Sequence, residues 1–399
     1  MNESKPQTAA HHRDRSVVPE FSNAADMLDA ESGVAAGVEP EVRFDAVRRA
    51  VDMRLDGLLR LECERWCEVD ADLRRGFDLL RAFISGGGKR LRPAFAFWGF
   101  VGSGGDPADE RIVELGAALE MLHTFALVHD DVMDGSLLRR HAPTIHSAFQ
   151  GDHDLHRWRG EPRRFGEGMA VLLGDLAFVY SDLLASDLPK AVRSGFHDLK
   201  VELHVGQYLD LWGAAQHEPN LDRARQVIRY KTARYSAERP LLLGATLAAD
   251  TPIAADMSRL HALREFGLAV GEAFQLRDDI LGAFGDPAVT GKPIGDDFRE
   301  GKQTILAVFT SSWASGDGER LASRAALAAL DRLGAPDLSE HEIGLLQGLV
   351  ESSGARSHVE GRIAELMHIA EQALPAACLG KTAEVALRSL AHQAAWRTA

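Results

Sequence analysis

The chain has 399 residues, of which 59 are acidic and 45 basic, and its net charge is −14. This balance argues against nucleic acid or an anionic membrane as the main partner, although local basic clusters still permit a diphosphate substrate. With 45% hydrophobic residues the chain can bury a large core, so we expect a soluble globular protein.

Most of the chain predicts helices. Residues 1–40 have no sustained apolar period and predict a disordered tail. From residue 41 onward apolar residues recur at i, i+3, i+4 and i+7, as in FDAVRRAVDMRLDGLLRL and RIVELGAALEMLHTFALV. Runs of alternating β-branched residues are missing, and no internal repeat stands out. The pattern predicts one all-α domain over 41–399, a single large helical bundle around a central cavity.

Three segments bear on loops, location and redox state. The longest stretch without a helical period, 150–168, predicts a polar loop that covers a site or is an insertion, and its His153 and His156 are more typical of surface histidines than of metal ligands. Cys63 and Cys67 lie four residues apart on a predicted helix, which favours neither a disulfide nor a zinc site. The N-terminus lacks a signal-peptide core, and apolar runs such as LLLGATLAA are about half the ~20 residues of a membrane span. We therefore expect a cytoplasmic protein with no membrane span.

Two acidic clusters carry the strongest chemical signal. In FALVHDDVMD, Asp130 and Asp134 are four residues apart and point the same way on a helix, with Asp131 beside them. One such cluster alone is more often a solvated helix end. A second pair, Asp278 and Asp279 in FQLRDDILGAFGD, again follows an apolar helical run. Two clusters predict one site between two helices, where Mg²⁺ and a polyphosphate neutralise the repelling carboxylates.

Basic residues are placed around both clusters. The glycine-rich GGGKRLRP offers backbone N–H groups and cations suited to phosphate oxygens, although alone it is a weak signal. Further basic residues follow the first cluster in LLRRHAPTIH, stand in YKTARYS, and follow the second cluster in TGKPIGDDFREGKQT, which also contains Asp297. Each pair alone is typical of a solvated face. Together, in an acidic chain, they predict a clamp on two anionic groups.

These motifs, in order between residues 84 and 304, closely resemble the trans-isoprenyl diphosphate synthases, also called polyprenyl synthetases, of the short-chain geranylgeranyl or farnesyl type. The strings that carry the likeness are GGGKRLRP, LEMLHTFALVHDDVMDGSLLRRHAPTIH, LLGDLAF, GQYLDL, YKT and GEAFQLRDDILGAFGDPAVTGKPIGDDFREGKQT. The resemblance implies the isoprenoid synthase fold, usually as a homodimer. It also implies a prenyltransferase that condenses isopentenyl diphosphate with an allylic diphosphate (dimethylallyl, geranyl or farnesyl) by Mg²⁺-assisted ionisation.

The resemblance also implies individual roles. Mg²⁺ ions, about three, would bind with the allylic diphosphate to Asp130, Asp134 and Asp278, with Asp131 and Asp279 in support. Contacts to the allylic diphosphate are implied for Arg139, Lys231, Lys292 and Lys302, and contacts to isopentenyl diphosphate for Lys89, Arg92, His123 and Arg140. A catalytic role is implied for Lys231, Thr232, Gln207 and Gln275, of which Thr232, Gln207 and Gln275 would lie near the allylic carbons.

The length of the product and one difference from the family's usual motif leave alternatives open. Ala126 lies one helical turn before Asp130, whereas Phe125 is ~140° round and would be core by the helical wheel alone. The resemblance instead makes Phe125 the floor of a C20 enzyme, with C15 or longer products as alternatives. Gly282 stands where the family commonly has a third aspartate. Its presence favours either weaker metal binding or a non-catalytic partner subunit. A terpene cyclase, the remaining alternative, is disfavoured by the two basic sets and the second acidic pair.

Overall fold

The computed structural model describes residues 40–216, 218–249, 257–286, 294–316, 318 and 321–397, with the backbone alone for 40–44. The predicted tail, apart from residue 40, lies outside these residues, as does Lys292. Within the described part almost all regular structure is helical, and the all-α prediction is confirmed. The one ladder among these residues is antiparallel and pairs Leu138 with Pro143.

In chain order the elements are α2 (Pro40–Cys67), α3 (Leu73–Ser85), α4 (Leu91–Gly102), α5 (Glu110–Asp134), β1 (Leu138–Arg139), β2 (Ala142–Pro143), α6 (Ile145–His156), α7 (Pro162–Ala185), α8 (Lys190–Gln216), α9 (Leu221–Val227), η1 (Ile228–Glu238), α10 (Arg239–Ala248), α11 (Met257–Phe284), α13 (Asp296–Arg299), α14 (Ile305–Ala314), α15 (Arg324–Asp331), α16 (Glu340–Ser352), α17 (Ala355–Ala373), η3 (Leu374–Ala377) and α18 (Lys381–Ala395).

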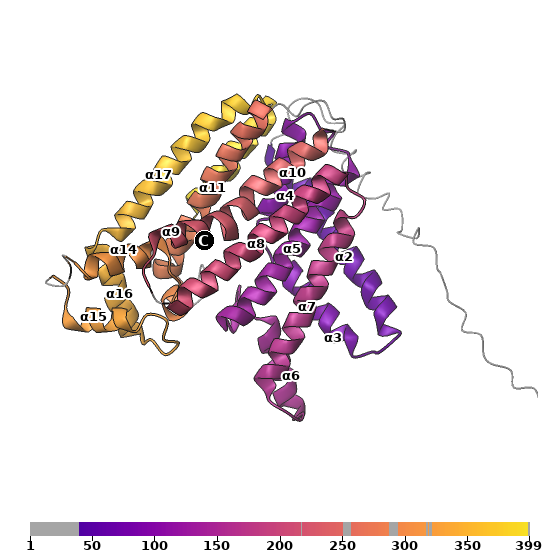
Figure 1. Cartoon of the computed structure of the whole chain (residues 1–399). Coiled ribbons are helices and arrows are strands. Elements are labelled where there is room, and N and C mark those ends of the chain that lie inside the picture. Colours follow the sequence, from indigo (N-terminus) through magenta and orange to yellow (C-terminus); the bar gives the residue numbers. More distant parts are fainter. Residues whose placement is uncertain are drawn as a thin grey trace, which may run out of the picture.

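The long helices pack side by side with α5 inside the bundle (Figure 1). Leu115, Leu119, Met121 and Leu122 on α5 are fully buried, because apolar or small residues occupy all sides of this helix. Gly135 ends α5 in the left-handed conformation, at φ 67°, directly after the acidic cluster. The cluster therefore lies where the chain leaves the core.

The segment η1 is a π-helix, a rare winding that frequently occurs at functional sites. It is held between α8 and α11 by two glycines. A Cβ atom on Gly206 of α8 would lie 2.3 Å from the backbone nitrogen of Lys231, and one on Gly271 of α11 would lie 2.5 Å from the Cα of Ala233. Only glycine permits so close an approach, so these two positions fix where η1 sits.

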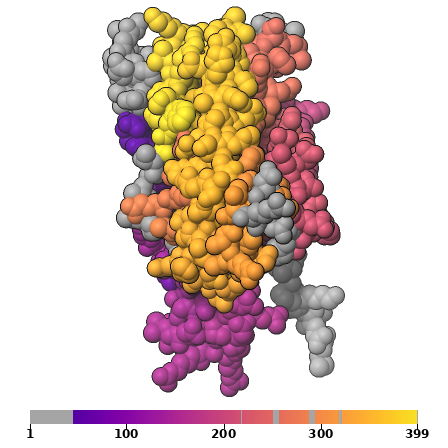
Figure 2. Space-filling view, turned by 90° about the vertical axis from the view of Figure 1, so that its left-hand side faces the viewer, coloured from indigo at the N-terminus to yellow at the C-terminus, as the bar shows by residue number. Residues whose placement is uncertain are grey.

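The prediction of a loop at 150–168 is wrong. Helix α6 runs through His156 and α7 begins at Pro162, which leaves only 157–161 without helix. Helix α6 and the start of α7 form a projection at one end of the molecule (Figure 2). Phe149 and His153 are buried there and contact Phe165, so a histidine occupies an apolar position and hides the helical period. The Nε2 atom of His153 lies 3.2 Å from the Arg159 carbonyl oxygen, a structural hydrogen bond.

By length and composition alone, two of the described helices, α5 and α7, could cross a bilayer. Helix α5 is a buried core helix. Helix α7 is different, because it exposes Leu172, Val179 and Leu183 along one stripe.

Candidate active site

A cavity of about 450 Å³ brings the two acidic clusters together. Asp130 reaches the cavity from α5, whereas Asp278 and Asp279 reach it from α11. More than a hundred residues of sequence separate these two helices. Asp131 and Asp134 lie beside this cavity and are held by basic side chains. The structure thus places both clusters around one site.

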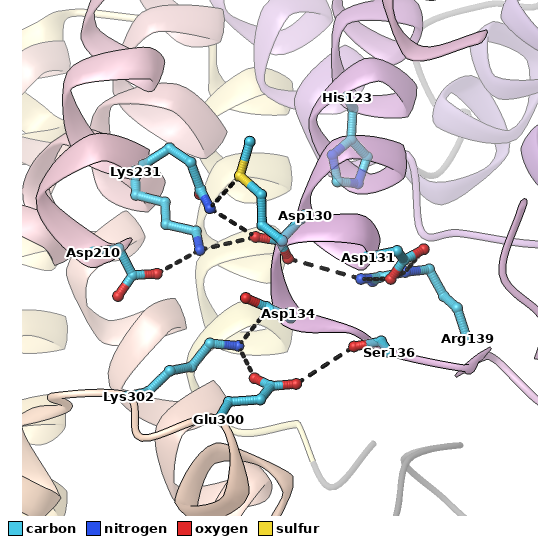
Figure 3. A network of polar contacts seen from close by, with 12 residues as sticks. His123, Asp130, Asp131, Asp134, Ser136, Arg139, Asp210, Lys231, Glu300 and Lys302 are labelled. Carbon is cyan, nitrogen blue, oxygen red and sulfur yellow. Dashed lines mark hydrogen bonds and ion pairs between the residues drawn. The ribbon is translucent and has the colours of Figure 1, made fainter. Parts of the chain in front are cut away.

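In the first cluster, lysines neutralise the carboxylates (Figure 3). The Nζ atom of Lys231 on η1 lies 3.0 Å from Asp130 and 2.6 Å from Asp210, and the Gln207 amide donates to Asp130 at 3.2 Å. The Nζ atom of Lys302 donates to Asp134 at 2.9 Å. Burial alone would raise the pKa of Asp130, but Lys231, Lys302 and Arg139 hold that pKa well below its usual range. Asp130 is therefore ionised and ready to accept other cations.

The β1–β2 hairpin positions the two arginines after this cluster. Arg139 forms an ion pair with the buried Asp131 at 2.6 Å and approaches Asp130 at 3.8 Å. Arg140 lies in the turn with φ 51°, and a Cβ atom on Gly88 would be 3.4 Å from its guanidinium. The turn thus brings Arg140 to the glycine-rich segment, as a shared anion site requires.

A second basic group, Arg92 and Arg140 with His123 beside them, also lines the cavity. Arg92 donates to the Ser236 hydroxyl at 2.8 Å and stacks over the Tyr235 ring, 4.3 Å from its centroid. The buried Nε of Arg92 has no hydrogen-bond partner among the described residues. His123 Nδ1 lies 3.1 Å from the Tyr235 hydroxyl. Burial lowers the pKa of His123 well below its ordinary value, and the neighbouring arginines lower it further, so the ring is neutral.

Two basic residues of GGGKRLRP lie elsewhere. Lys89 is exposed and does not line the cavity, although it borders the same turn. Arg90 is buried and pairs with Glu120 at 2.9 Å and with Asp52 at 2.8 Å. Its role is to fix the start of α4.

The second cluster combines carboxylates, an amide and a hydroxyl. Gln275 donates to Asp279 at 2.8 Å and accepts from the Thr232 hydroxyl at 2.5 Å. Burial raises the pKa of Asp279 well above its usual range, and the nearby Asp297 raises it further. Asp278 forms an ion pair with Arg397, whose guanidinium lies 4.1 Å from the centroid of the Phe274 ring.

Ala126 and Phe125, the two residues expected to limit the length of the prenyl product, point in different directions. Ala126 lines the cavity, whereas Phe125 is not among its lining residues. The Phe125 ring packs into an aromatic group with His129, Phe178 and His204, at centroid distances of 4.7, 4.9 and 5.4 Å. Phe125 therefore lies behind the wall that Ala126 forms.

Sequence reasoning did not single out four residues of this site: Asp210, Tyr235, Ser236 and Arg397. Asp210 stood within GQYLDL, and Tyr235 and Ser236 within YKTARYS, so the motifs contained them. No local pattern marks Arg397, which reaches Asp278 across 119 positions of sequence.

The residues present fit Mg²⁺ bound together with a diphosphate. As the described side chains stand, no three His, Cys, Asp or Glu residues gather closely enough to hold a metal alone, because lysines and arginines occupy the carboxylates. Carboxylate oxygens are the ligands that Mg²⁺ takes along with phosphate oxygens. The Nε atom of Arg92, which has no partner in the part of the chain that the structure describes, and the flanking cations suit the phosphate groups.

Comparison with known proteins identifies the family. A family model described as polyprenyl synthetase matches residues 77–327. The chain belongs to the polyprenyl synthetase family. The family predicted from the motifs is thereby confirmed.

Relatives of this polyprenyl synthetase are similar over most of their length. The short chain isoprenyl diphosphate synthase of Methanothermobacter thermautotrophicus is 34% identical over 254 residues, 61% of this chain and 71% of the relative. The (2E,6E)-farnesyl diphosphate synthase of Mycobacterium bovis is 32% identical over 273 residues, 67% of this chain and 68% of the relative. The geranylgeranyl pyrophosphate synthase of Corynebacterium glutamicum, solved with isoprenyl diphosphate and magnesium, has a TM-score of 0.81 and 33% identity, covering 88% of this chain and 98% of that one.

Proposed function

We propose that this trans-prenyltransferase condenses isopentenyl diphosphate with an allylic diphosphate and releases mainly geranylgeranyl diphosphate, C20. The observation that carries the proposal is the single cavity where two acidic clusters and two basic groups meet. The relatives support a short product, since they are named farnesyl, geranylfarnesyl and geranylgeranyl diphosphate synthases. Farnesyl diphosphate, C15, is the alternative that those names favour next.

The acidic clusters are the proposed magnesium site. Asp130, Asp134 and Asp278 would hold the ions, about three with the allylic diphosphate, while Asp131 and Asp279 support them. Bound Mg²⁺ supplies positive charge where the departing diphosphate gains negative charge. For these ions to bind, Lys231, Lys302 and Arg397 must release their carboxylates.

The released cations have a second use in the proposal. Lys231, Lys302 and Arg139 would turn from carboxylates to the allylic diphosphate, and Lys292, outside the described residues, is assigned there by the resemblance alone. Gln207, Thr232 and Gln275 line the same cavity with amide and hydroxyl dipoles, and the Thr232 hydroxyl donates to Gln275. Dipoles placed there stabilise the allylic cation without forming a bond to it.

The second basic group would hold isopentenyl diphosphate. Arg92 and Arg140 supply charge, with Lys89 at the edge of the glycine-rich turn. His123 is neutral and lies against Tyr235, so it contributes a hydrogen bond and not a charge.

This partition predicts opposite effects of two substitutions. Arg92→Ala is expected to raise KM for isopentenyl diphosphate by roughly 10- to 100-fold, since hydrogen bonds to charged groups contribute about 1.5–3 kcal/mol. Lys231→Ala is expected to raise KM for the allylic substrate instead. Initial rates measured against each substrate in turn would test this, and equal effects on both KM values would contradict it. Arg193→Ala, an exposed arginine on α8, is the control.

The product proposal is tested with radiolabelled isopentenyl diphosphate. Dimethylallyl, geranyl and farnesyl diphosphates are offered separately with Mg²⁺, and the products are separated by chain length. Incorporation with a C20 product supports the proposal. No incorporation from any primer would instead favour a non-catalytic partner subunit.

We also propose that the chain forms a homodimer through α7 and α8. Apolar side chains with helical spacing are exposed on both helices, with Leu172 63% and Tyr208 62% accessible. The same stripes contain Val179, Leu183, Val201, Val205 and Trp212. Burying these stripes against a second copy removes them from water.

The double variant Leu172→Glu/Tyr208→Glu is therefore expected to be monomeric in sedimentation velocity experiments where the native chain is dimeric. Leu155→Glu, an exposed leucine on α6, is the matched control and should leave the dimer intact. A native monomer, or a dimer that survives the double substitution, would rule out this interface.

A cytoplasmic location is proposed on the cysteines. All three are free, and the Sγ atoms of Cys63 and Cys67 lie 3.6 Å apart as a thiol hydrogen bond and not as a disulfide, which a reducing compartment favours.

A further inference from the structure

Gly282, which replaces a common aspartate of the second cluster, has its side-chain position filled by another residue. It lies on α11 four residues after Asp278 and therefore on the same face, and it lines the same cavity. A Cβ atom on Gly282 would be 2.1 Å from Oδ2 and 2.7 Å from Cγ of Asp297. The carboxylate of Asp297 thus occupies the volume that a side chain at position 282 would take.

The backbone around Asp297 holds it in this place. The Gly295 nitrogen donates to the Gly282 carbonyl oxygen at 3.2 Å, which ties the start of α13 to α11. Gly295 has φ 72°, and Phe298 is buried immediately after Asp297. The Lys302 nitrogen donates to the Asp297 carbonyl oxygen at 3.1 Å. The approach of Asp297 to Gly282 is therefore anchored on both sides.

The Asp297 carboxylate belongs to the same charged group as the two clusters. It lines the cavity with Asp278 and Asp279, and one of its oxygens lies 3.9 Å from the Nζ of Lys302. That lysine also holds Asp134 of the first cluster. Asp297 is therefore linked to both clusters and competes for the same cations.

We propose that Asp297 supplies the acidic group that position 282 lacks, so that the second cluster of the magnesium site consists of Asp278, Asp279 and Asp297. The inference rests on the proposed function, because it assigns Asp297 to the Mg²⁺ and diphosphate of that site. The carboxylate comes from the next short helix and not from α11. A glycine at 282 is then a requirement of the site and not a sign of an inactive subunit.

The test moves the carboxylate from position 297 to position 282 on α11. Three variants are compared with the native protein: Asp297→Ala, Gly282→Asp, and the double variant Gly282→Asp/Asp297→Ala. All three Asp297 atoms nearest to the added Cβ lie beyond the Cβ of Asp297, so alanine at 297 makes room for aspartate at 282. The readout is Mg²⁺ affinity, measured by calorimetry with inorganic pyrophosphate present, and thermal melting reports folding.

Asp297→Ala is expected to weaken Mg²⁺ affinity by about 10- to 100-fold, as loss of a group that supports a metal site does. The double variant is expected to recover to within a few-fold of native. Gly282→Asp alone is expected to melt at a lower temperature than the double variant, because it adds a carboxylate against another one. Asp286→Ala controls for the loss of one negative charge near the end of α11, at an exposed residue.

Unchanged Mg²⁺ affinity in folded Asp297→Ala, or a double variant no better than Asp297→Ala, would overturn the inference. These results differ from failure of the proposed function. In that case the native protein itself would neither bind Mg²⁺ with pyrophosphate nor condense the substrates.

Discussion

Replacing Asp130 with alanine is expected to lower kcat by about 1000-fold or more while the fold survives. Metal ions contribute several kcal/mol to stabilising charge in a transition state, and every 1.36 kcal/mol is a factor of ten. Asp130 is the member of the first cluster that lines the cavity and contacts Lys231 and Gln207. Its removal therefore takes away both a metal ligand and the partner that positions these two side chains.

Folding should be affected far less, because Lys231 keeps its ion pair with Asp210 at 2.6 Å. The experiment measures kcat at saturating Mg²⁺ and substrates, together with the melting temperature. Asp187→Ala, an exposed aspartate after α7, removes the same side chain away from the site and should retain native kcat. Turnover near the native value in folded Asp130→Ala would show that Asp130 does not hold the metal.

Replacing Phe125 with alanine is expected to lengthen the product beyond C20 and to destabilise the protein by about 3–5 kcal/mol. The Phe125 ring fills the space between Phe178 on α7 and His204 on α8. Leu203, the neighbour of His204, lines the cavity, as does Ala126. Removing the ring opens a hole behind this wall, and each added five-carbon unit gains about 0.8 kcal/mol per buried CH₂.

Product spectrum and melting temperature are measured on the same preparation. Phe196→Ala is the matched control, since Phe196 is also a buried phenylalanine, on α8, and does not line the cavity. It should lower the melting temperature and leave the product unchanged. If Phe125→Ala behaves like this control, Phe125 is ordinary core and Ala126 sets the depth.

Helical periodicity and acidic spacing were sufficient to predict the fold class and the clusters that border the cavity. Both are local signals: an apolar stripe every three to four residues specifies a buried helix face, and D-D-x-x-D places carboxylates on one side. The resemblance added roles for residues such as Arg92 and Gln207 that no local rule assigns. The structure places these two in the cavity.

What sequence reasoning missed depends on contacts between distant segments. Helix α6 was predicted as loop because His153 fills an apolar position, which is evident only from its packing against Phe165. The contact of Arg397 with Asp278 and that of Asp297 with Gly282 are likewise evident only from the folded structure. Each joins residues whose separation along the chain carries no periodic signal.

The π-helical winding of η1 requires a constant number of residues in this segment. Lys231 near its start faces the cavity, whereas the buried Glu238 at its end binds Arg234 at 3.1 Å and Arg264 at 3.2 Å. Losing or gaining one residue between them would rotate Lys231 against Glu238 by roughly a quarter of a turn. Point substitutions preserve this phase, but deletions and insertions destroy it. Homologous sequences should therefore show substitutions in this segment but neither insertions nor deletions.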